Sequence, residues 1–212
     1  MRNRVMGLAL ALAMVPAAGM MTSGTAQAQV SQGHKFLEAV RKKDIEAAKT
    51  MLGSSGAKST PGNIIVNTRD ITTGDSALHV VINRRDMGWL RYLVSNQADV
   101  NIRNNQGTTP LWLSVNTSFT EGALELIARG AKVNDPGPAG ETPLISAVHQ
   151  KNLELARALL AAGADANKAD NSGRSAVDFA LLSAKGTQLG NEVEAAGKAA
   201  KAKKTKTYGP SL

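Results

Sequence analysis

Cysteine is absent from the 212-residue chain, and aromatic residues make up only 3% of it. Without cysteine the chain can form no disulfide bond and can carry no lipid on a cysteine side chain. A folded state must therefore be held together by packing alone. No recognisable catalytic or metal-binding signature is present either, because the three histidines, His34, His79 and His149, are widely separated and show no ligand spacing. We expect no enzyme activity, no cofactor and no metal.

Long hydrophobic runs are scarce, and the one near the N-terminus, Val5 to Val15, is shorter than the roughly 20 residues that span a membrane. Two arginines precede this run, and small residues ending in Ala26-Gln27-Ala28 follow it. This order predicts a bacterial secretory signal peptide over residues 1–28, cleaved after Ala28, and hence a periplasmic or secreted protein. The alternative is an uncleaved membrane anchor.

Positive charge exceeds negative charge by +8, but the excess is local. Residues 184–212 hold six lysines against Glu192 and Glu194, so the high isoelectric point does not indicate nucleic-acid binding by the body of the chain. We expect a helical cap from about Gln188, followed by a lysine-rich flexible tail. The tail is either simply solvated or attaches electrostatically to anionic envelope polymers or lipid head groups.

A repeat of 33 residues organises the middle of the chain. Glycines recur at 74, 107, 140 and 173, and asparagines recur at 101, 134 and 167. Two residues after each glycine comes a related tetrapeptide, SALH, TPLW, TPLI or SAVD, whose first residue suits a helix N-cap. A second apolar pair follows about sixteen residues later, and Gly130 and Gly163 then suit a helix C-terminus. Each unit is predicted to be turn, helix, helix, turn.

These motifs resemble the ankyrin-repeat family, whose 33-residue unit opens with G-x-T-P-L-H-x-A and ends with G-A-D-V-N. The resemblance implies an all-α solenoid with short β-hairpin-like connections, with three full units and a half unit over residues 68–183. Gln97 replaces the usual helix-ending glycine, and neighbouring Asn96 tolerates left-handed geometry. Gly122 is expected to weaken the second helix of repeat two. Arg85, Ser118 and Lys151 stand where the family has a glycine between its helices.

Residues 35–52 align without a gap with residues 143–160, which predicts an N-terminal capping helix pair within residues 29–67. Between this pair and the first regular unit, residues 53–62 are an insertion that begins with GSSGAKST. The letters partly match a P-loop and the S-x-x-K of serine hydrolases. The P-loop glycine positions hold Leu52 and Ala57, however, and no S-D-N or K-T-G follows. We interpret the insertion as a connecting loop.

Partner binding is the function that the resemblance implies, because a solenoid exposes a long concave face and nothing in the repeat demands an enclosed pocket. We expect a monomer that binds a protein. His79 is expected to make core hydrogen bonds, whereas Trp112 either fills the stack or forms a partly exposed anchor. The family's partners usually meet the hairpin tips and the ends of the first helices. In this chain those positions, with two neighbours, are Thr72, Thr73, Asp75, Asn83, Arg84, Arg103, Asn105, Gln106, Thr108, Trp112, Asn116, Thr117, Ala139, Glu141, His149, Gln150, Asn171 and Arg174.

Overall fold

The computed structural model describes residues 23–54 and 65–207, which form ten α-helices and one 3-10 turn. Most of the predicted signal peptide and of the inserted loop lies outside these residues. The elements are α1 (Ser23–Lys42), α2 (Ile45–Ser54), α3 (Ala77–Asn83), α4 (Met87–Ser95), α5 (Pro110–Asn116), α6 (Thr120–Ala128), η1 (Pro138–Gly140), α7 (Pro143–His149), α8 (Leu153–Ala161), α9 (Ala176–Ser183) and α10 (Gln188–Thr207).

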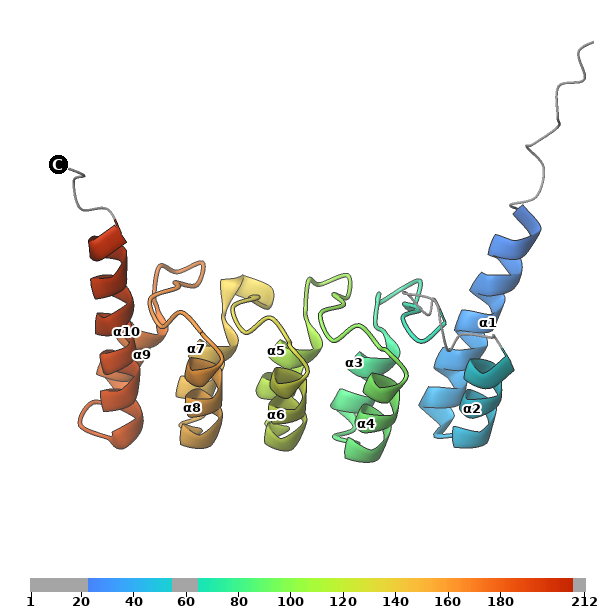
Figure 1. Ribbon diagram of the computed structural model, residues 1–212, viewed down its shortest axis with the longest axis horizontal. Helices are drawn as coiled ribbons and strands as arrows, with labels where there is room; N and C mark the ends of the chain where they lie inside the picture. The colour runs from blue at the N-terminus through green and yellow to red at the C-terminus, as the bar shows by residue number, and fades with distance from the viewer. Residues whose placement is uncertain (1–22, 55–64, 208–212) are drawn as a thin grey trace, which may run out of the picture.

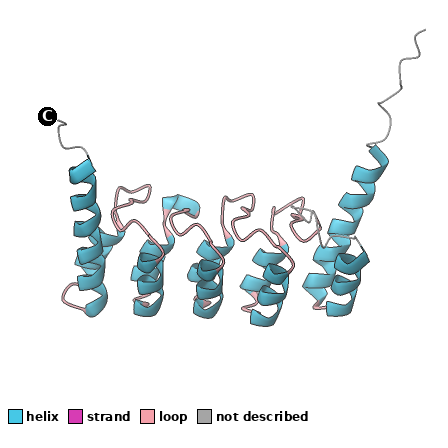
Figure 2. Ribbon diagram, in the orientation of Figure 1, coloured by secondary structure: helices cyan, strands magenta, loops and turns pink. Residues whose placement is uncertain are grey.

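The helices form antiparallel pairs that stack side by side in one row (Figure 1). All the long connecting loops lie along one edge of the row, and α1 and α10 stand at its two ends and reach past those loops (Figure 1). Figure 2 shows helices and loops throughout the described part of the chain. The only strand-like pairings within it are isolated bridges from Arg69 to Ser76 and from Ala169 to Ser175. The predicted all-α helical-repeat solenoid is confirmed.

The first helix of each regular unit begins where the sequence predicts. The side chains of Thr109, Thr142 and Ser175 accept hydrogen bonds from backbone N–H groups three residues later. Each bond satisfies one donor that the first helical turn would otherwise leave unpaired. These three caps are themselves buried, so they also fix where the chain turns from the loop into the core.

Four of the turns between paired helices keep a left-handed backbone at a residue other than glycine. Lys43, Arg85, Ser118 and Lys151 have φ values of 60°, 53°, 55° and 54°. Residues other than glycine are strained at positive φ, so these four residues raise the energy of the turn relative to glycine. The backbone conformation of the turn is nevertheless the left-handed one that glycine favours. At the end of α4, Gln97 itself adopts φ 65°, whereas Asn96 stays at −95°. The expectation that Asn96 would take this geometry is corrected.

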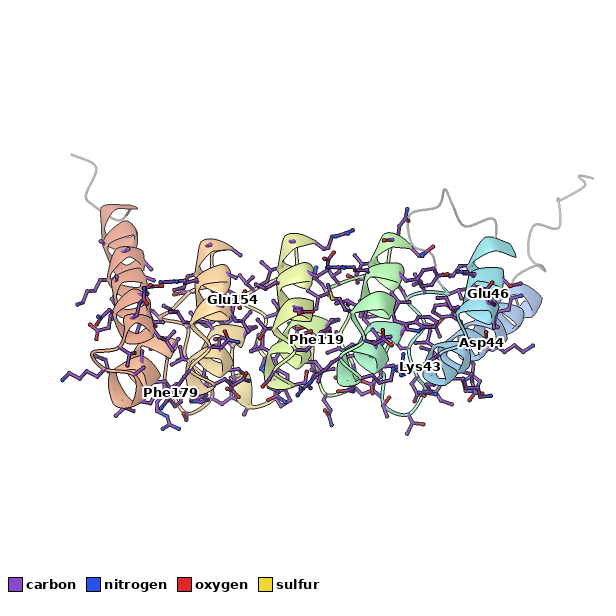
Figure 3. All side chains as sticks on the ribbon, turned by 90° about the horizontal axis from the view of Figure 1, so that it is seen from below. Lys43, Asp44, Glu46, Phe119, Glu154 and Phe179 are labelled. Carbon is purple, nitrogen blue, oxygen red and sulfur yellow. The ribbon has the colours of Figure 1, made fainter. Side chains whose placement is uncertain are left out.

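Buried aliphatic side chains from every pair form one continuous core, and side chains fill the spaces between neighbouring pairs (Figure 3). The recurring asparagines explain part of the 33-residue period. The side-chain oxygens of Asn67, Asn101 and Asn134 each accept a backbone N–H of the following unit, at 2.7, 2.8 and 2.8 Å. Asn167 continues this ladder by donating to the Gly197 carbonyl of α10 at 2.9 Å.

Gly122 has a packing role that the sequence did not indicate. A Cβ at this position would overlap the ring of Phe119, which is buried just before α6 and is labelled in Figure 3. Glycine has a lower helix propensity than alanine, so it weakens α6, but the absence of a side chain leaves room for the Phe119 ring in the core.

The C-terminal cap begins at Gln188, as predicted, and packs Leu189 and Val193 into the core. A forked ion pair from Arg157 of α8 to Glu192, with atoms 2.6–3.1 Å apart, fixes α10 against the repeat stack. The helix then continues to Thr207. Most of the lysine run is thus helical. No helix within residues 23–54 and 65–207 combines the length and apolar character needed to cross a membrane.

Candidate functional site

Four equivalent loops precede the first helices, and we name them by residue range. Hairpin 1 is residues 69–76, hairpin 2 is 102–109, hairpin 3 is 135–142 and hairpin 4 is 168–175. A hollow of about 310 Å³ lies between the tips of hairpins 1 and 2. It is lined by residues that are all of polar type: Thr72, Thr73, Asp75, Asn104, Asn105 and Gln106. The structure thus brings together five of the predicted partner-binding residues, which are all of these except Asn104.

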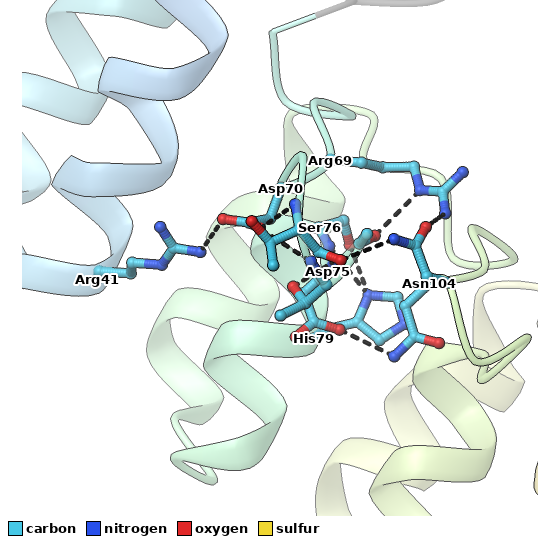
Figure 4. A network of polar contacts seen from close by, with 11 residues as sticks. Arg41, Arg69, Asp70, Asp75, Ser76, His79 and Asn104 are labelled. Carbon is cyan, nitrogen blue, oxygen red and sulfur yellow. Dashed lines mark hydrogen bonds and ion pairs between the residues drawn. The ribbon is translucent and has the colours of Figure 1, made fainter.

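Asp70 holds hairpin 1 in shape. One carboxylate oxygen accepts the backbone N–H groups of Thr72 and Thr73, and the other pairs with Arg41 of α1 at 2.6 Å (Figure 4). The hydrogen bond from Arg41, with smaller contributions from the two backbone donors, holds the pKa of Asp70 well below its ordinary value. The tip of hairpin 1 is therefore anchored to the N-terminal helix pair.

His79 holds hairpins 1 and 2 together from below. The Ser76 N–H donates to His79 Nδ1, so the proton is on Nε2, which donates to the Thr108 carbonyl at 2.9 Å. The ring is completely buried, and burial lowers the pKa of His79. The predicted structural role of His79 is confirmed.

Asn104 and Asn105 complete the link between these hairpins. Asn104 Nδ2 donates to the Asp75 carboxylate at 2.9 Å (Figure 4), and Asn105 Nδ2 donates to the Thr72 carbonyl at 2.9 Å. Asn105 Oδ1 also accepts from Arg69 at 2.9 Å. With these bonds made, the floor of the hollow is pre-organised, so a ligand would not have to order it.

Ile71 stands at the tip of hairpin 1 with 88% of its surface exposed, more than any other large apolar side chain in the described residues. Sequence reasoning missed it, although an isoleucine among polar turn residues is a signal that could have identified it. Thr72, the next residue, and Gln106 line the hollow and are also exposed. Hairpin 1 thus presents an exposed apolar side chain next in sequence to a residue that lines the hollow.

Two predicted contact residues do not belong to an accessible surface. Thr108 is 2% exposed and Trp112 is 8% exposed. The Thr108 carbonyl accepts the hydrogen bond from His79. The Trp112 ring packs against the backbone of Gly137 in hairpin 3. Of the two interpretations of Trp112, the structure supports filling of the stack, and the partly exposed anchor is corrected.

Other predicted contact residues bind within the chain. Arg84 donates to the Val40 carbonyl at 2.6 Å, and Gln150 donates to the Val115 carbonyl at 2.7 Å, so each caps the preceding first helix. Arg103 pairs with Asp135 at 2.8 Å. Thr117 donates to the Leu113 carbonyl at 2.8 Å. Arg84 thus acts as an interhelical cap while 22% of its side-chain surface stays exposed. Asn83 and Asn116 are exposed at the ends of α3 and α5.

A smaller cluster occupies the third and fourth units. The Glu141 carboxylate accepts from Ser146 Oγ at 2.9 Å and lies 3.2 Å from His149 Nδ1. The His149 ring meets Phe179 edge to face at 4.2 Å, and the Arg174 guanidinium lies 4.6 Å from the centre of the same ring. Glu141, His149 and Arg174, predicted separately, are thus joined through Phe179, which was not predicted.

Neither cluster has the arrangement of a catalytic or metal centre. Within the described residues no three histidine, cysteine, aspartate or glutamate side chains lie close enough together to hold a metal ion. Ser146 Oγ donates to the Glu141 carboxylate, which also lies close to His149, so these three side chains hold one another in place. Hairpins 1 and 2 present polar side chains that hydrogen bonds between the two loops hold in place.

Comparison with protein families accounts for the repeat architecture. A family described as ankyrin repeats (3 copies) matches residues 36–137, and one described as ankyrin repeats (many copies) matches residues 126–180. The two matches overlap and together extend from α1 into α9, across all four hairpins. No curated protein matches the chain. The chain belongs to the ankyrin-repeat family, whose repeats generally act as protein-interaction scaffolds.

Proposed function

We propose that this protein is an exported, non-catalytic scaffold that binds a partner protein through hairpins 1 and 2. The observation that carries the proposal is Ile71, which is 88% exposed and directly precedes Thr72, a residue that lines the hollow. Buried apolar anchors surrounded by polar contacts dominate the energy of many protein interfaces. Ile71 would supply the anchor, and the Thr72 hydroxyl and the Gln106 amide would pair with the partner's polar groups.

The helix-end residues Asn83 and Asn116 extend this surface, because they lie on the first helices that follow hairpins 1 and 2. Both side chains are exposed. We expect them to contribute less than Ile71, since exposed polar contacts at an interface rim are worth little. The protein acts as a monomer in this proposal, with one partner-binding edge.

Export rests on the arginines, the apolar run and the small residues of the first 28 positions. Cleavage after Ala28 would shorten α1 but would leave the fully buried Phe36 and Leu37 in place. The prediction is a periplasmic protein whose N-terminal residue is Gln29. Cell fractionation followed by N-terminal sequencing tests it, and a cytoplasmic chain that retains Met1 would contradict it.

Affinity capture from envelope extract tests the binding surface. The bait is residues 29–212, compared with Ile71→Asp and with Leu182→Asp. Leu182 is a matched control because it is also apolar and 75% exposed, but lies at the end of α9. We expect the same protein to be retained by the wild type and by Leu182→Asp and to be lost with Ile71→Asp. Equal retention by all three baits would refute the role of Ile71.

A second candidate function is a spacer that attaches to anionic envelope polymers or lipid head groups through α10. It is favoured by the continuation of α10 to Thr207, beyond its buried residues, with most of the chain's C-terminal lysines in this segment. Electrostatic attachment weakens as salt screens the charges. Removal of residues 198–212 should release the protein from envelope fractions, and attachment that survives both this truncation and high salt would exclude the spacer.

A further inference from the structure

Hairpins 2, 3 and 4 share one backbone hydrogen bond at the base of the loop. It runs from Asn104 N–H to the Thr108 carbonyl at 3.1 Å in hairpin 2, and from Gly137 to Glu141 at 2.9 Å in hairpin 3. In hairpin 4 it runs from Asp170 to Arg174 at 2.9 Å. This backbone bond therefore closes the three loops in the same way, and differences in their stability come from their side chains and from the rest of their backbones.

The side chain of the residue whose N–H makes this bond braces hairpins 2 and 4 but not hairpin 3. Asn104 Oδ1 accepts from the N–H groups of Gln106 and Thr108 at 3.0 Å. Asp170 Oδ1 accepts from Ser172 and Arg174 at 2.8 and 3.0 Å. The corresponding residue of hairpin 3 is Gly137, which has no side chain to accept these donors.

Hairpin 3 is also strained and only loosely attached at its tip. Ala139 adopts φ 61°, a region that a side chain disfavours. The Glu141 N–H reaches only the Pro138 carbonyl, at 3.5 Å. Arg103 holds the start of the loop through Asp135, and the Asn171 N–H reaches the Ala139 carbonyl at 3.0 Å. The Glu141 carboxylate also accepts from Ser146 Oγ at 2.9 Å. Between the attachments of Asp135 and Glu141 lies η1, drawn in yellow in Figure 1.

Trp112 explains why hairpin 3 carries a glycine. A Cβ at position 137 would overlap the indole ring of Trp112. A residue with a side chain, such as the asparagine or aspartate that braces hairpins 2 and 4, therefore does not fit at this position. The equivalent residue of the first unit, His79, donates from Nε2 to the Thr108 carbonyl of the next hairpin. Trp112 makes no such bond, because its Nε1 is buried without an acceptor. A buried donor without a partner favours any state in which water or another acceptor can reach it.

We propose that hairpin 3 is a lid over Trp112. It opens locally, between its attachments to Arg103 and Asn171, while the helices on either side stay folded. Opening breaks the bond between Gly137 and Glu141, relieves the strain at Ala139 and lets Trp112 Nε1 donate to water. Local openings of this kind occur in folded proteins wherever few bonds hold a segment. In the open state the indole is exposed on the hairpin edge, so the edge has a conditional aromatic anchor as well as Ile71.

Amide hydrogen exchange by NMR on residues 29–212 tests the lid without any substitution. The matched probes are the amides of Asn104, Gly137 and Asp170, which make the same backbone bond. After correction for intrinsic rates, Gly137 should be protected at least tenfold less than the other two. The Trp112 indole N–H should exchange with the same protection as Gly137. Equal protection of the three amides, or an indole N–H that exchanges only with global unfolding, would overturn the proposal.

Two variants distinguish local opening of hairpin 3 from low stability of the whole third unit. Trp112→His combined with Gly137→Asp rebuilds the arrangement of the braced hairpins and should raise protection at position 137 at least tenfold. Trp112→Phe keeps an aromatic ring but removes the unpaired donor, and it should raise protection by a smaller factor. Unchanged protection in both folded variants would contradict the lid, and the wild-type comparison decides the question if the double variant does not fold.

Discussion

Arg84, at the end of α3, donates from Nη1 to the carbonyl of Val40 in α1 at 2.6 Å. The same nitrogen lies 3.2 Å from the Arg41 carbonyl, and the Asp86 carboxylate lies 3.9 Å from Nη2. One guanidinium thus caps the C-terminus of the preceding unit's first helix, where carbonyl groups lack helical partners. Gln150 does the same for α5 through Val115. Residues that resemble surface contacts in the sequence therefore bind the solenoid together.

Arg84→Ala should destabilise the fold by about 1–3 kcal/mol, because it removes a charged donor from partly buried carbonyl groups. Asn83→Ala, one residue earlier and exposed, is the matched control and should change stability by less than about 0.5 kcal/mol. Urea unfolding measures both. An equal effect of the two substitutions would show that the cap contributes nothing specific.

Gly122→Ala should destabilise the protein by about 1–3 kcal/mol, although alanine is the better helix former. The added methyl group would collide with the Phe119 ring. Gly88→Ala is the control, since Gly88 lies in α4 and its Cβ would meet only the Asp86 carboxylate at 3.6 Å. It should stabilise the protein by up to about 1 kcal/mol. Thermal melts of the two variants should therefore shift in opposite directions.

Lys151→Gly should stabilise the protein by about 0.5–1 kcal/mol, because glycine adopts the observed φ of 54° without a clash. The flexibility that glycine adds to the unfolded chain opposes part of this gain. Lys185→Gly is the comparison, since Lys185 is exposed in the next helix-helix turn but has no left-handed φ. It should be neutral or destabilising in chemical denaturation. A loss of stability in Lys151→Gly would refute the assignment of strain.

Stability should fall as the pH drops below about 6.5, the ordinary pKa of histidine in an unfolded chain. Burial lowers the pKa of His79 in the folded state, so below that pH the unfolded state binds more protons and is favoured. One such group gives a slope of at most about 1.4 kcal/mol per pH unit. The slope should be smaller in His79→Gln when unfolding is measured between about pH 5 and pH 7. An unchanged slope would mean that other groups cause it.

The repeat period predicted the fold well because its signals are local. A Ser or Thr before an apolar residue caps a helix wherever it occurs, and Thr109 and Thr142 do so here. Gly130 and Gly163 adopt the left-handed φ values expected after the second helices, 82° and 91°. These features depend on neighbours within a few residues, which the sequence shows directly.

The parts that the sequence did not predict depend on side chains that cross between units. Whether Arg84 faces solvent or the Val40 carbonyl depends on where α1 ends beside it. Trp112 and Gly137 are 25 positions apart, and only stacking reveals that one requires the other. Ile71 could have been noticed, but its exposure follows from Asp70 holding the turn beneath it. Recognition of a repeat thus places the loops without showing which loop side chains remain free.

Site-directed photo-crosslinking in the producing cells tests the proposed binding edge most directly. A photoreactive amino acid would replace Ile71 in one strain and Leu182 in another, both in the full-length protein. We predict a discrete crosslinked protein from position 71 and none from position 182. Crosslinks from position 182 alone, or from neither position under conditions in which affinity capture retains a partner, would contradict binding through hairpins 1 and 2.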